Sequence, residues 1–335
     1  MRVLVVNPGS SSLKASLVVD GERVEDDDVA AERGGEELAA VLDRWSPVDA
    51  AGVRFVHGGP DLTAPVLVDD EALRTLEGTV ELAPLHNPTS LAVARTLRDA
   101  GLRVVACFDT AFHATLPAAA ATYALPRAWN RAWRLRRYGF HGLSYEYVAA
   151  RAAEQLGRPL AELRLVLCHL GGGASACAVV GGRSVDTTMG FTPMEGLAMQ
   201  VRSGSVDPGL LLWLLQTGRV GLDELADALE HRSGLRGLSG TSGDIREVLA
   251  GLDEGDEDCR LAFDVYVHRL AAAVGAMAAS AGGLDALVFT GGVGAHVARV
   301  RDVLAERLAH LGPVPVLVIA TGEDLAIAAH VERLL

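Results

Sequence analysis

Two stretches of this sequence follow one pattern and decide the fold: RVLVVNPGSSSLKASLVV at residues 2–19 and LRLVLCHLGGGASACAVV at residues 163–180. In each stretch an apolar run leads into a turn of small residues, and a second apolar run follows. Apolar runs bounded by glycine and serine are typical of β-strands joined by turns. The recurrence of the pattern predicts two related α/β halves rather than an array of short repeats.

The rest of the chain is expected to alternate between helices and strands. Apolar runs predict further strands within 52–59, 103–108, 286–289 and 314–319. Helical spacing predicts helices at 36–44, 70–82, 89–100, 207–217, 222–229, 259–281 and 323–335. The helix at 259–281 is long and largely apolar, so we expect it to be buried between domains or subunits.

The composition restricts the classes of function. The chain has 335 residues, with 30 basic and 43 acidic side chains and a formal net charge of −13. This balance argues against a general nucleic-acid or anionic-membrane surface. The first apolar run, Val3 to Val6, is too short for the core of a signal peptide. We therefore expect a soluble cytoplasmic protein without a nucleic-acid or membrane partner.

Cysteine and lysine usage give two further indications. Cys107, Cys168, Cys177 and Cys259 have no CxxC spacing, so neither a disulfide framework nor a zinc site is indicated. Lys14 is the one lysine in the sequence, and it follows a glycine-serine turn. A compact, flexible ammonium at such a turn suits an anion site. The alternative is chance, because a composition this rich in arginine must leave its last lysine somewhere.

Loops of small residues follow apolar strands at 7–12, 171–175 and 290–294. Backbone N–H groups in such turns bind phosphate oxygens, and Ser10, Ser11 and Ser12 add hydroxyl donors. Neither GxxxxGK[ST] nor a GxGxxG after the first strand is present. The pattern favours nucleotide-phosphate binding by loops of another kind, and plain glycine turns remain the alternative.

Eleven motifs in fixed order resemble those of the acetate kinases over nearly the whole chain. They are NPGSSSLK (7–14), FVHGG (55–59), LAPLHNP (82–88), FDTAFH (108–113), RRYGFHGLSYEYV (136–148), CHLGGGAS (168–175), DTTMGFTPMEGLAM (186–199), RSGSVDPG (202–209), SGLRGLSGTSGDIR (233–246), FTGGVG (289–294) and EDLAIA (323–328). The resemblance implies an α/β fold with two duplicated actin-like (ribonuclease H-like) domains around a nucleotide cleft, in a homodimer. It places domain I at 1–111 plus 324–335 and domain II at 112–323.

The implied reaction is reversible, Mg²⁺-dependent transfer of the ATP γ-phosphoryl group to acetate, which gives acetyl phosphate and ADP. The motifs carry the family's site residues onto this chain in four groups. The catalytic group is Arg54, Asp109, His141 and Arg202. The acyl pocket is Arg54, Val56, Leu85, Phe140 and Pro193. The nucleotide group is Ser10, Ser12, Lys14, His169, Leu170, Gly171, Gly172, Gly173, Asp244, Ile245, Arg246, Gly292, Val293, Gly294, Ala295 and His296. The Mg²⁺ ligands are Asn7 and Glu323.

The role of Asp109 is open on residue type alone, because a carboxylate there can act as a base, orient an arginine or bind a metal through water. Acetate has a pKa of roughly 4 to 5 and is already ionised at neutral pH. No proton has to be removed from such a nucleophile. We therefore favour an orienting or metal-side role for Asp109 over general base.

The sequence departs from the family pattern at several places. It is shorter between the first predicted hairpin and Arg54, and again between Gly294 and Val314. Ala295-His296 stands where the family usually has Glu-Asn. These differences leave pyrophosphate open as a phosphoryl donor, and the acyl pocket leaves propionate or butyrate open as acceptors. A remote alternative is a non-catalytic scaffold of the actin or Hsp70 kind, for which loss of the acyl-side arginines is expected.

Overall fold

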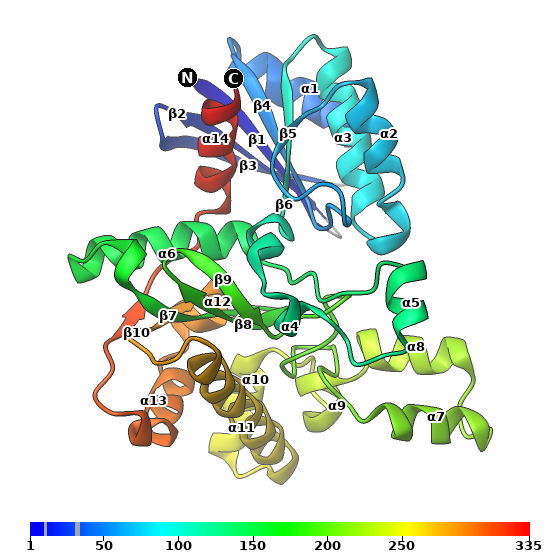
Figure 1. The fold of residues 1–335 in the computed structure, drawn as a ribbon, viewed down its shortest axis with the longest axis vertical. Helices are drawn as coiled ribbons and strands as arrows, with labels where there is room; N and C mark the ends of the chain where they lie inside the picture. The colour runs from blue at the N-terminus through cyan, green and yellow to red at the C-terminus, as the bar shows by residue number, and fades with distance from the viewer. Residues whose placement is uncertain (10–11, 31–33) are drawn as a thin grey trace. The chain divides into compact units, whose positions relative to one another are not determined.

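The computed structural model describes residues 1–9, 12–30 and 34–335. The chain forms two compact units, each around its own mixed sheet (Figure 1). Unit 1 comprises Met1–Thr115, Phe140–Tyr147 and Thr321–Leu335, and unit 2 comprises Leu116–Gly139 and Val148–Ala320. The units thus assign residues 140–147 to the N-terminal part, whereas the domain limits expected from the sequence, 1–111 with 324–335 and 112–323, remain a prediction.

The sheet of unit 1 has the strand order β3-β2-β1-β4-β6-β5. Its strands are β1 (Arg2–Pro8), β2 (Ser12–Val19), β3 (Glu22–Ala30), β4 (Ala50–Phe55), β5 (Val66–Leu67) and β6 (Val104–Phe108). The strands β1, β2 and β3 are antiparallel neighbours, and β1, β4 and β6 are parallel neighbours. Asn7 on β1 lies directly opposite Lys14 on β2.

Helices cover both faces of this sheet (Figure 1). They are α1 (Gly34–Trp45), α2 (Asp70–Glu77), α3 (Asn87–Asp99) and α14 (Glu323–Leu334), with single 3₁₀ turns at Val80–Leu82 and Ala111–Thr115. Val3 and Val5 pack with Ile327 and Val331 of α14 in one buried cluster. A Cβ at Gly52 would lie 2.3 Å from Ile327 Cγ2, so the close approach of α14 to β4 requires glycine there.

The five-stranded sheet of unit 2, with the order β11-β10-β7-β8-β9, repeats the arrangement of β3, β2, β1, β4 and β6 in unit 1, where β5 is added antiparallel to β6. Its strands are β7 (Arg164–Leu170), β8 (Ala174–Val180), β9 (Arg183–Thr187), β10 (Ala286–Thr290) and β11 (Val316–Val318). Three antiparallel strands are again followed by two parallel ones. This correspondence confirms the prediction of two related α/β halves.

Unit 2 also carries most of the helices. They are α4 (Ala118–Ala121), α5 (Arg127–Ala132), α7 (Pro208–Gln216), α8 (Leu222–His231), α9 (Gly234–Ser239), α10 (Ile245–Glu254), α11 (Glu257–Ser280), α12 (Gly291–His296) and α13 (Ala298–Arg307), with 3₁₀ turns at Leu160–Glu162 and Ala309–Leu311. The helix α6 (Gly142–Leu156) begins in unit 1 and continues in unit 2.

Two expectations about this unit need correction. The helix α11 packs on β7, β8 and β9 and on α9 and α10, so it is a core helix of unit 2 and not an element between domains. Its expected burial between subunits remains a prediction. The helix α11 is long and apolar enough to cross a membrane, but buried core helices often have the same length and composition. The predicted loop at 290–294 is instead the start of α12, because Gly291, at φ 76°, turns the chain from β10 into a helix.

Candidate active site

In unit 1, Arg54 is the centre of a cluster at the carboxyl ends of parallel strands. Arg54 lies near the end of β4, and Asp109 follows the neighbouring strand β6. The guanidinium donates from Nε to Asp109 Oδ1 at 3.0 Å and from Nη2 to Oδ2 at 2.5 Å. This bidentate arrangement is the strongest geometry available to an arginine and a carboxylate.

Asn7 and Glu323 complete the cluster. Arg54 Nη1 donates to Asn7 Oδ1 at 2.8 Å, and Asn7 Nδ2 donates to Glu323 Oε2 at 3.1 Å. The distance from Arg54 Nη1 to Glu323 Oε2 is 3.9 Å. Four residues that were predicted one by one, and that lie far apart in the sequence, are therefore brought together in one unit.

The charges in this cluster depend on one another. Burial alone would lower the pKa of Arg54, but Asp109 and Glu323 raise it above its ordinary value. Burial raises the pKa of Asp109, and the Arg54 guanidinium opposes that shift. The ionised form of Asp109 thus depends on Arg54, because a buried carboxylate is costly without a cation beside it.

His141 lies beside the same strand end, in a backbone conformation that is uncommon for a side chain of its size. Its φ is 59°, and the next N–H, of Gly142, donates to the Asp109 carbonyl at 2.9 Å. A Cβ at Gly142 would lie 2.1 Å from that carbonyl oxygen. The strained turn therefore fixes His141 next to Asp109 along the backbone.

The predicted acyl-pocket residues of unit 1 differ in burial. Phe140 and Val56 are buried, whereas Leu85 is 57% exposed. The Phe140 carbonyl is fixed by His113 Nε2 at 2.9 Å, and its ring meets the His57 ring edge to face at 5.5 Å between centroids. Phe140 and Val56 have the fixed, apolar character expected of a pocket wall, and Leu85 does not share it.

Unit 1 also has a cavity of about 350 Å³ next to the cluster. It is lined by Val5, Asn7, Lys14, Ala15, Ser16, Arg23, Asp26, Asp27, Asp28, Thr321, Glu323 and Asp324. The predicted phosphate ligand Lys14 and both predicted Mg²⁺ ligands are thus part of one cavity wall. Of the predicted serines, Ser10 lies outside the described residues, and Ser12 is the first residue of β2.

Asn7 and Glu323 fit a magnesium ion that keeps most of its water. Mg²⁺ takes hard oxygen ligands and is commonly held by one or two protein groups together with phosphate oxygens. Asn7 Nδ2 donates to Glu323 Oε2, so the two side chains lie side by side, and each carries an oxygen of the kind that Mg²⁺ binds. In the described part of the chain no group of three acidic, histidine or cysteine side chains is placed to bind a metal.

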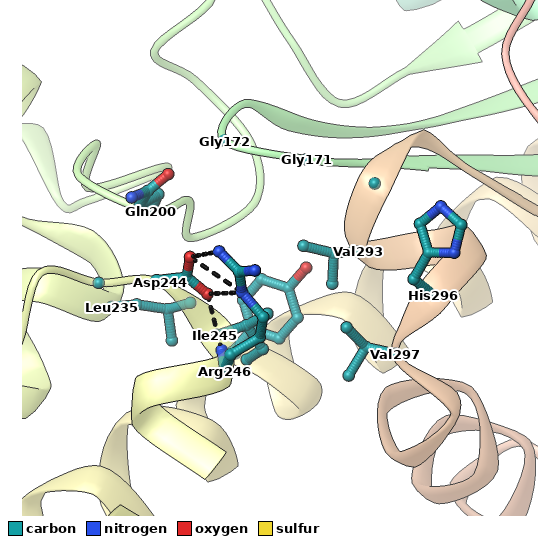
Figure 2. Close-up of a pocket in the computed structure, with 13 residues that line it drawn as sticks. Gly171, Gly172, Gln200, Leu235, Asp244, Ile245, Arg246, Val293, His296 and Val297 are labelled. Atoms are coloured by element: carbon teal, nitrogen blue, oxygen red, sulfur yellow. Dashed lines mark hydrogen bonds and ion pairs between the residues drawn. The ribbon is translucent and has the colours of Figure 1, made fainter. Parts of the chain in front are cut away.

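Unit 2 has a pocket of about 420 Å³, shown in Figure 2. It lies between the turn after β7, the start of α10 and the helix α12, which follows β10. It is lined by Gly171, Gly172, Gln200, Leu235, Gly243, Asp244, Ile245, Arg246, Tyr266, Gly292, Val293, His296 and Val297. Two of the three loops predicted from small residues, and the GDIR motif, therefore meet in one place.

Glycines at the edge of this pocket allow the loops to approach closely. Gly243 has φ 80°, and a Cβ there would lie 2.4 Å from the Gln200 carbonyl oxygen. A Cβ at Gly291 would lie 2.5 Å from the Leu170 carbonyl oxygen. Asp244 caps α10 by accepting from the Arg246 N–H at 2.9 Å, and its carboxylate also binds the Arg246 guanidinium (Figure 2).

The pocket contains part of the predicted nucleotide group and several residues that were not predicted. Gly171, Gly172, Asp244, Ile245, Arg246, Gly292, Val293 and His296 line it, whereas His169, Leu170, Gly173, Gly294 and Ala295 do not. Sequence reasoning missed Gln200, Leu235, Tyr266 and Val297, whereas Gly243 is the first residue of the GDIR motif. Leu235 could have been found within the motif at 233–246, but no motif points to Tyr266 in the middle of a long helix.

Arg202 and Pro193, the two remaining predicted residues, are joined in unit 2. Arg202 Nη1 donates to the Pro193 carbonyl at 3.3 Å. No ion pair joins Arg202 to a carboxylate within the residues that the structure describes, in contrast with Arg54. Burial lowers the pKa of Arg202, and the more distant Glu230 opposes this shift. An arginine without a neutralising partner is well prepared to bind an anion.

Comparisons with known proteins agree with this geometry. The model of the acetokinase family matches residues 23–322. An acetate kinase from Synechococcus sp. (strain JA-2-3B'a(2-13)) is 43% identical over 402 aligned positions, which cover 100% of this chain and 99% of that protein. The crystal structure of Porphyromonas gingivalis acetate kinase matches with a TM-score of 0.91 and 33% identity, over 99% of both chains. That of a propionate kinase from Francisella tularensis subsp. tularensis SCHU S4 matches with a TM-score of 0.90 and 32% identity, over 98% of both chains.

These matches span nearly the whole chain, and both structural matches have the two-unit fold described above. The chain belongs to the acetokinase family and is a phosphotransferase with a carboxyl group as acceptor.

Proposed function

We propose that this protein catalyses reversible transfer of the γ-phosphoryl group of ATP to acetate, with Mg²⁺, to give acetyl phosphate and ADP. The observation that supports it most directly is the pocket of about 420 Å³ in unit 2. Ligand pockets for small molecules and cofactors span about 300–1,000 Å³, so this one has room for a nucleoside. A donor without a nucleoside, such as pyrophosphate, has no need of such a pocket.

In the proposed step a carboxylate oxygen of acetate forms a bond to the γ-phosphorus. The bond from that phosphorus to the bridging oxygen of ADP breaks, and ADP keeps the electron pair. Charge spreads over the equatorial oxygens of the transferring group, so cations and hydrogen-bond donors stabilise the transition state. We assign this role to Arg202 and His141, and the binding of the acceptor carboxylate to Arg54.

Asp109 serves this reaction as an orienting group. Both of its carboxylate oxygens accept hydrogen bonds from Arg54, and ionised acetate has no proton to give up. Asp109 therefore fixes the direction and charge of the guanidinium that binds the acceptor. A proton-transfer role for Asp109 has no step to act in at neutral pH.

Asn7 and Glu323 would hold Mg²⁺, which neutralises phosphate charge when it is bound. Lys14, Gly171 and Gly172 are proposed to bind phosphate oxygens. The residues of the GDIR motif and of α12 that line the pocket are proposed to bind the nucleoside. Asn7 Oδ1 also accepts a hydrogen bond from Arg54. The proposed Mg²⁺ ligand Asn7 and the arginine proposed to bind acetate therefore orient each other.

Acceptor preference is the first test of this proposal. With ATP and Mg²⁺, acetate is expected to be the best acceptor, and propionate to have a lower kcat/KM. One methylene in an apolar pocket changes binding by about 1–3 kcal/mol, or roughly 10–200-fold. Trapping the acyl phosphate with hydroxylamine measures the rates for acetate, propionate and butyrate in parallel. If kcat/KM is higher for propionate or butyrate than for acetate, that carboxylate and not acetate is the preferred acceptor.

The phosphoryl donor is tested in the same assay with pyrophosphate in place of ATP. Pyrophosphate is the alternative because Ala295 and His296 replace the family's usual pair, and His296 lines the pocket. We expect activity with ATP and little with pyrophosphate. If neither donor yields acyl phosphate but the folded protein binds ATP, the non-catalytic scaffold becomes the better description.

We also propose that the protein is a cytoplasmic homodimer. Helix α7 supports an interface, because none of its nine residues is buried although most are apolar. Leu210, Leu212 and Trp213 are 46%, 56% and 46% exposed. Patches of this kind mark interaction surfaces. Light scattering after gel filtration is expected to give twice the chain mass for the wild type and a lower mass for Leu212→Glu. A monomeric wild type at micromolar concentration would contradict the proposal.

A further inference from the structure

A hydrogen-bonded network in unit 2 joins three side chains that lie far apart in the sequence. The Tyr123 hydroxyl donates to Glu195 Oε2 at 2.6 Å, and Arg137 Nη2 donates to Glu195 Oε1 at 2.7 Å. Glu195 therefore uses both carboxylate oxygens. We call Tyr123, Arg137 and Glu195 the Glu195 clamp.

The Glu195 clamp holds the backbone of the loop at residues 188–195. The Phe191 N–H donates to the Tyr123 hydroxyl oxygen at 2.8 Å, so this hydroxyl both accepts and donates. Arg137 Nη1 donates to the carbonyls of Thr188 and Met189, each at 3.0 Å. Five hydrogen bonds on one loop, two of them to a carboxylate, fix its conformation strongly.

The chain before α6 also binds this loop. The N–H groups of Tyr138 and Gly139 both donate to the Gly190 carbonyl, at 3.0 and 3.2 Å. A Cβ at Gly190 would lie 1.7 Å from Glu195 Oε2 and 2.2 Å from the Tyr123 hydroxyl oxygen. Only glycine permits the loop to approach the clamp this closely.

The loop that is held in this way carries one predicted site residue and touches another. Pro193, from the predicted acyl pocket, lies within it, and the Pro193 carbonyl accepts from Arg202 Nη1 at 3.3 Å. This is the one hydrogen bond from Arg202 to an oxygen in the described part of the chain. The direction of the Arg202 guanidinium thus depends on where the loop places Pro193.

Resting on the function proposed above, we propose that Tyr123, Arg137 and Glu195 are positioning residues. They fix the position of Pro193, a predicted wall residue of the acyl pocket, and through the Pro193 carbonyl they orient the guanidinium of Arg202. Burial and the Glu195 carboxylate raise the pKa of Tyr123, which keeps its hydroxyl a donor at neutral pH. None of the three is among the predicted site residues. A displacement of about 1 Å at a reacting group can cost 10²-fold in rate, so the clamp is expected to affect catalysis through geometry.

Tyr123→Phe is the decisive variant, because it removes the hydroxyl and keeps the ring. We expect it to lower kcat with acetate about tenfold, with the KM for ATP and the Tm near wild type. The matched control is Tyr138→Phe, from the same segment. The Tyr138 hydroxyl donates to the Arg134 carbonyl at 3.2 Å, outside the 188–195 loop, so this variant should behave as wild type. Glu195→Gln is expected to resemble Tyr123→Phe.

Two readouts separate positioning from a general loss of structure. In an Arg202→Lys background, Tyr123→Phe should have less than a twofold further effect, because the guanidinium that it positions is gone. Independently of any activity, modification of Arg202 by phenylglyoxal, followed by peptide mass spectrometry, should be several-fold faster in Tyr123→Phe than in Tyr138→Phe.

The outcomes are distinguishable from failure of the proposed function. A wild type that makes no acyl phosphate contradicts that function, while the phenylglyoxal rates still test the clamp. Equal rates of Arg202 modification in the two phenylalanine variants would overturn the clamp. So would a tenfold kcat loss that persists undiminished in the Arg202→Lys background.

Discussion

Replacing Arg202 by alanine is expected to lower kcat by about 10³-fold, a loss typical of an arginine that stabilises transferring phosphoryl charge. The dissociation constant for ATP should stay within about twofold of wild type. The reason is the different environment of the two site arginines. Arg202 donates to one backbone carbonyl, whereas Arg54 is bound by Asp109 and Asn7. The charge of Arg202 is thus available to a group that becomes more negative during the reaction.

Steady-state kinetics by hydroxamate trapping and ATP binding by calorimetry measure the two quantities separately. An interaction made only in the transition state lowers kcat and kcat/KM together and leaves ground-state binding unchanged. Arg202→Lys, which keeps the charge but not the planar fork, should fall between alanine and wild type. A turnover near wild type for Arg202→Ala would remove Arg202 from the catalytic group, and weaker ATP binding at unchanged kcat would make it a nucleotide ligand.

The strands that sequence reasoning found are those with their own apolar signal. β1 and β2, and likewise β7 and β8, are apolar runs joined by a turn of small residues. The duplication of the α/β halves was visible from this repeated pattern. β3, ERVEDDDVA, was missed because its residues are mostly charged. It becomes a strand by pairing with β2 at the edge of the sheet, where charged side chains prevent further association. Strand formation there is decided by the neighbour and not by the segment.

Helix boundaries show the same limit. The predicted helix at 70–82 is divided, because α2 ends at Glu77 and Gly78 caps it before a 3₁₀ turn. The helices α4, α5, α6, α9, α10, α12 and α13 were not predicted. α6 begins after His141, whose positive φ is stabilised by the contact of Gly142 with the Asp109 carbonyl. A contact with a residue 33 positions away in the chain has no local signature.

In the candidate site, too, sequence reasoning identified residues but not their contacts. Motifs identified Asn7, Arg54, Asp109 and Glu323 one by one, and the fold joins them through side-chain hydrogen bonds. One of those bonds, from Asn7 to Glu323, spans 316 positions. The motifs contained Tyr123, Arg137 and Glu195 only in part and did not indicate that they form a network. Residue types can be predicted where a resemblance exists, but their mutual contacts require the topology.

The second large effect is expected from Arg54→Ala, through both stability and catalysis. Removing Arg54 leaves Asp109, whose side chain is 2% exposed, without its cation. Breaking a buried ion pair by removing one partner costs about 3–5 kcal/mol of unfolding free energy. The same change removes the group proposed to bind the acceptor, so the KM for acetate should rise at least tenfold. Urea denaturation and acyl-phosphate kinetics measure the two effects.

A double variant separates these effects. In Arg54→Met/Asp109→Leu both charges are gone, and replacement of a buried ion pair by apolar side chains is often neutral or stabilising. We therefore expect the double variant to recover most of the lost stability and none of the lost activity. Recovery of activity would mean that Arg54 and Asp109 serve only the fold. A single variant as stable as wild type would mean that Asp109 does not depend on Arg54 for its charge.

The pH dependence of Arg54→Met provides a check that does not involve catalysis. Burial raises the pKa of Asp109, and without Arg54 that shift is unopposed. The folded variant then binds a proton at a pH where the unfolded chain, with an aspartate pKa of about 3.9, has lost it. Because the folded state holds more protons, its stability must rise as the pH falls from 7 towards 5. The urea midpoint of Arg54→Met should therefore lie below that of Arg54→Met/Asp109→Leu at pH 7. At pH 5 the two midpoints should be close. An equal difference between the two variants at both pH values would show that the cost of losing Arg54 is packing and not the charge of Asp109.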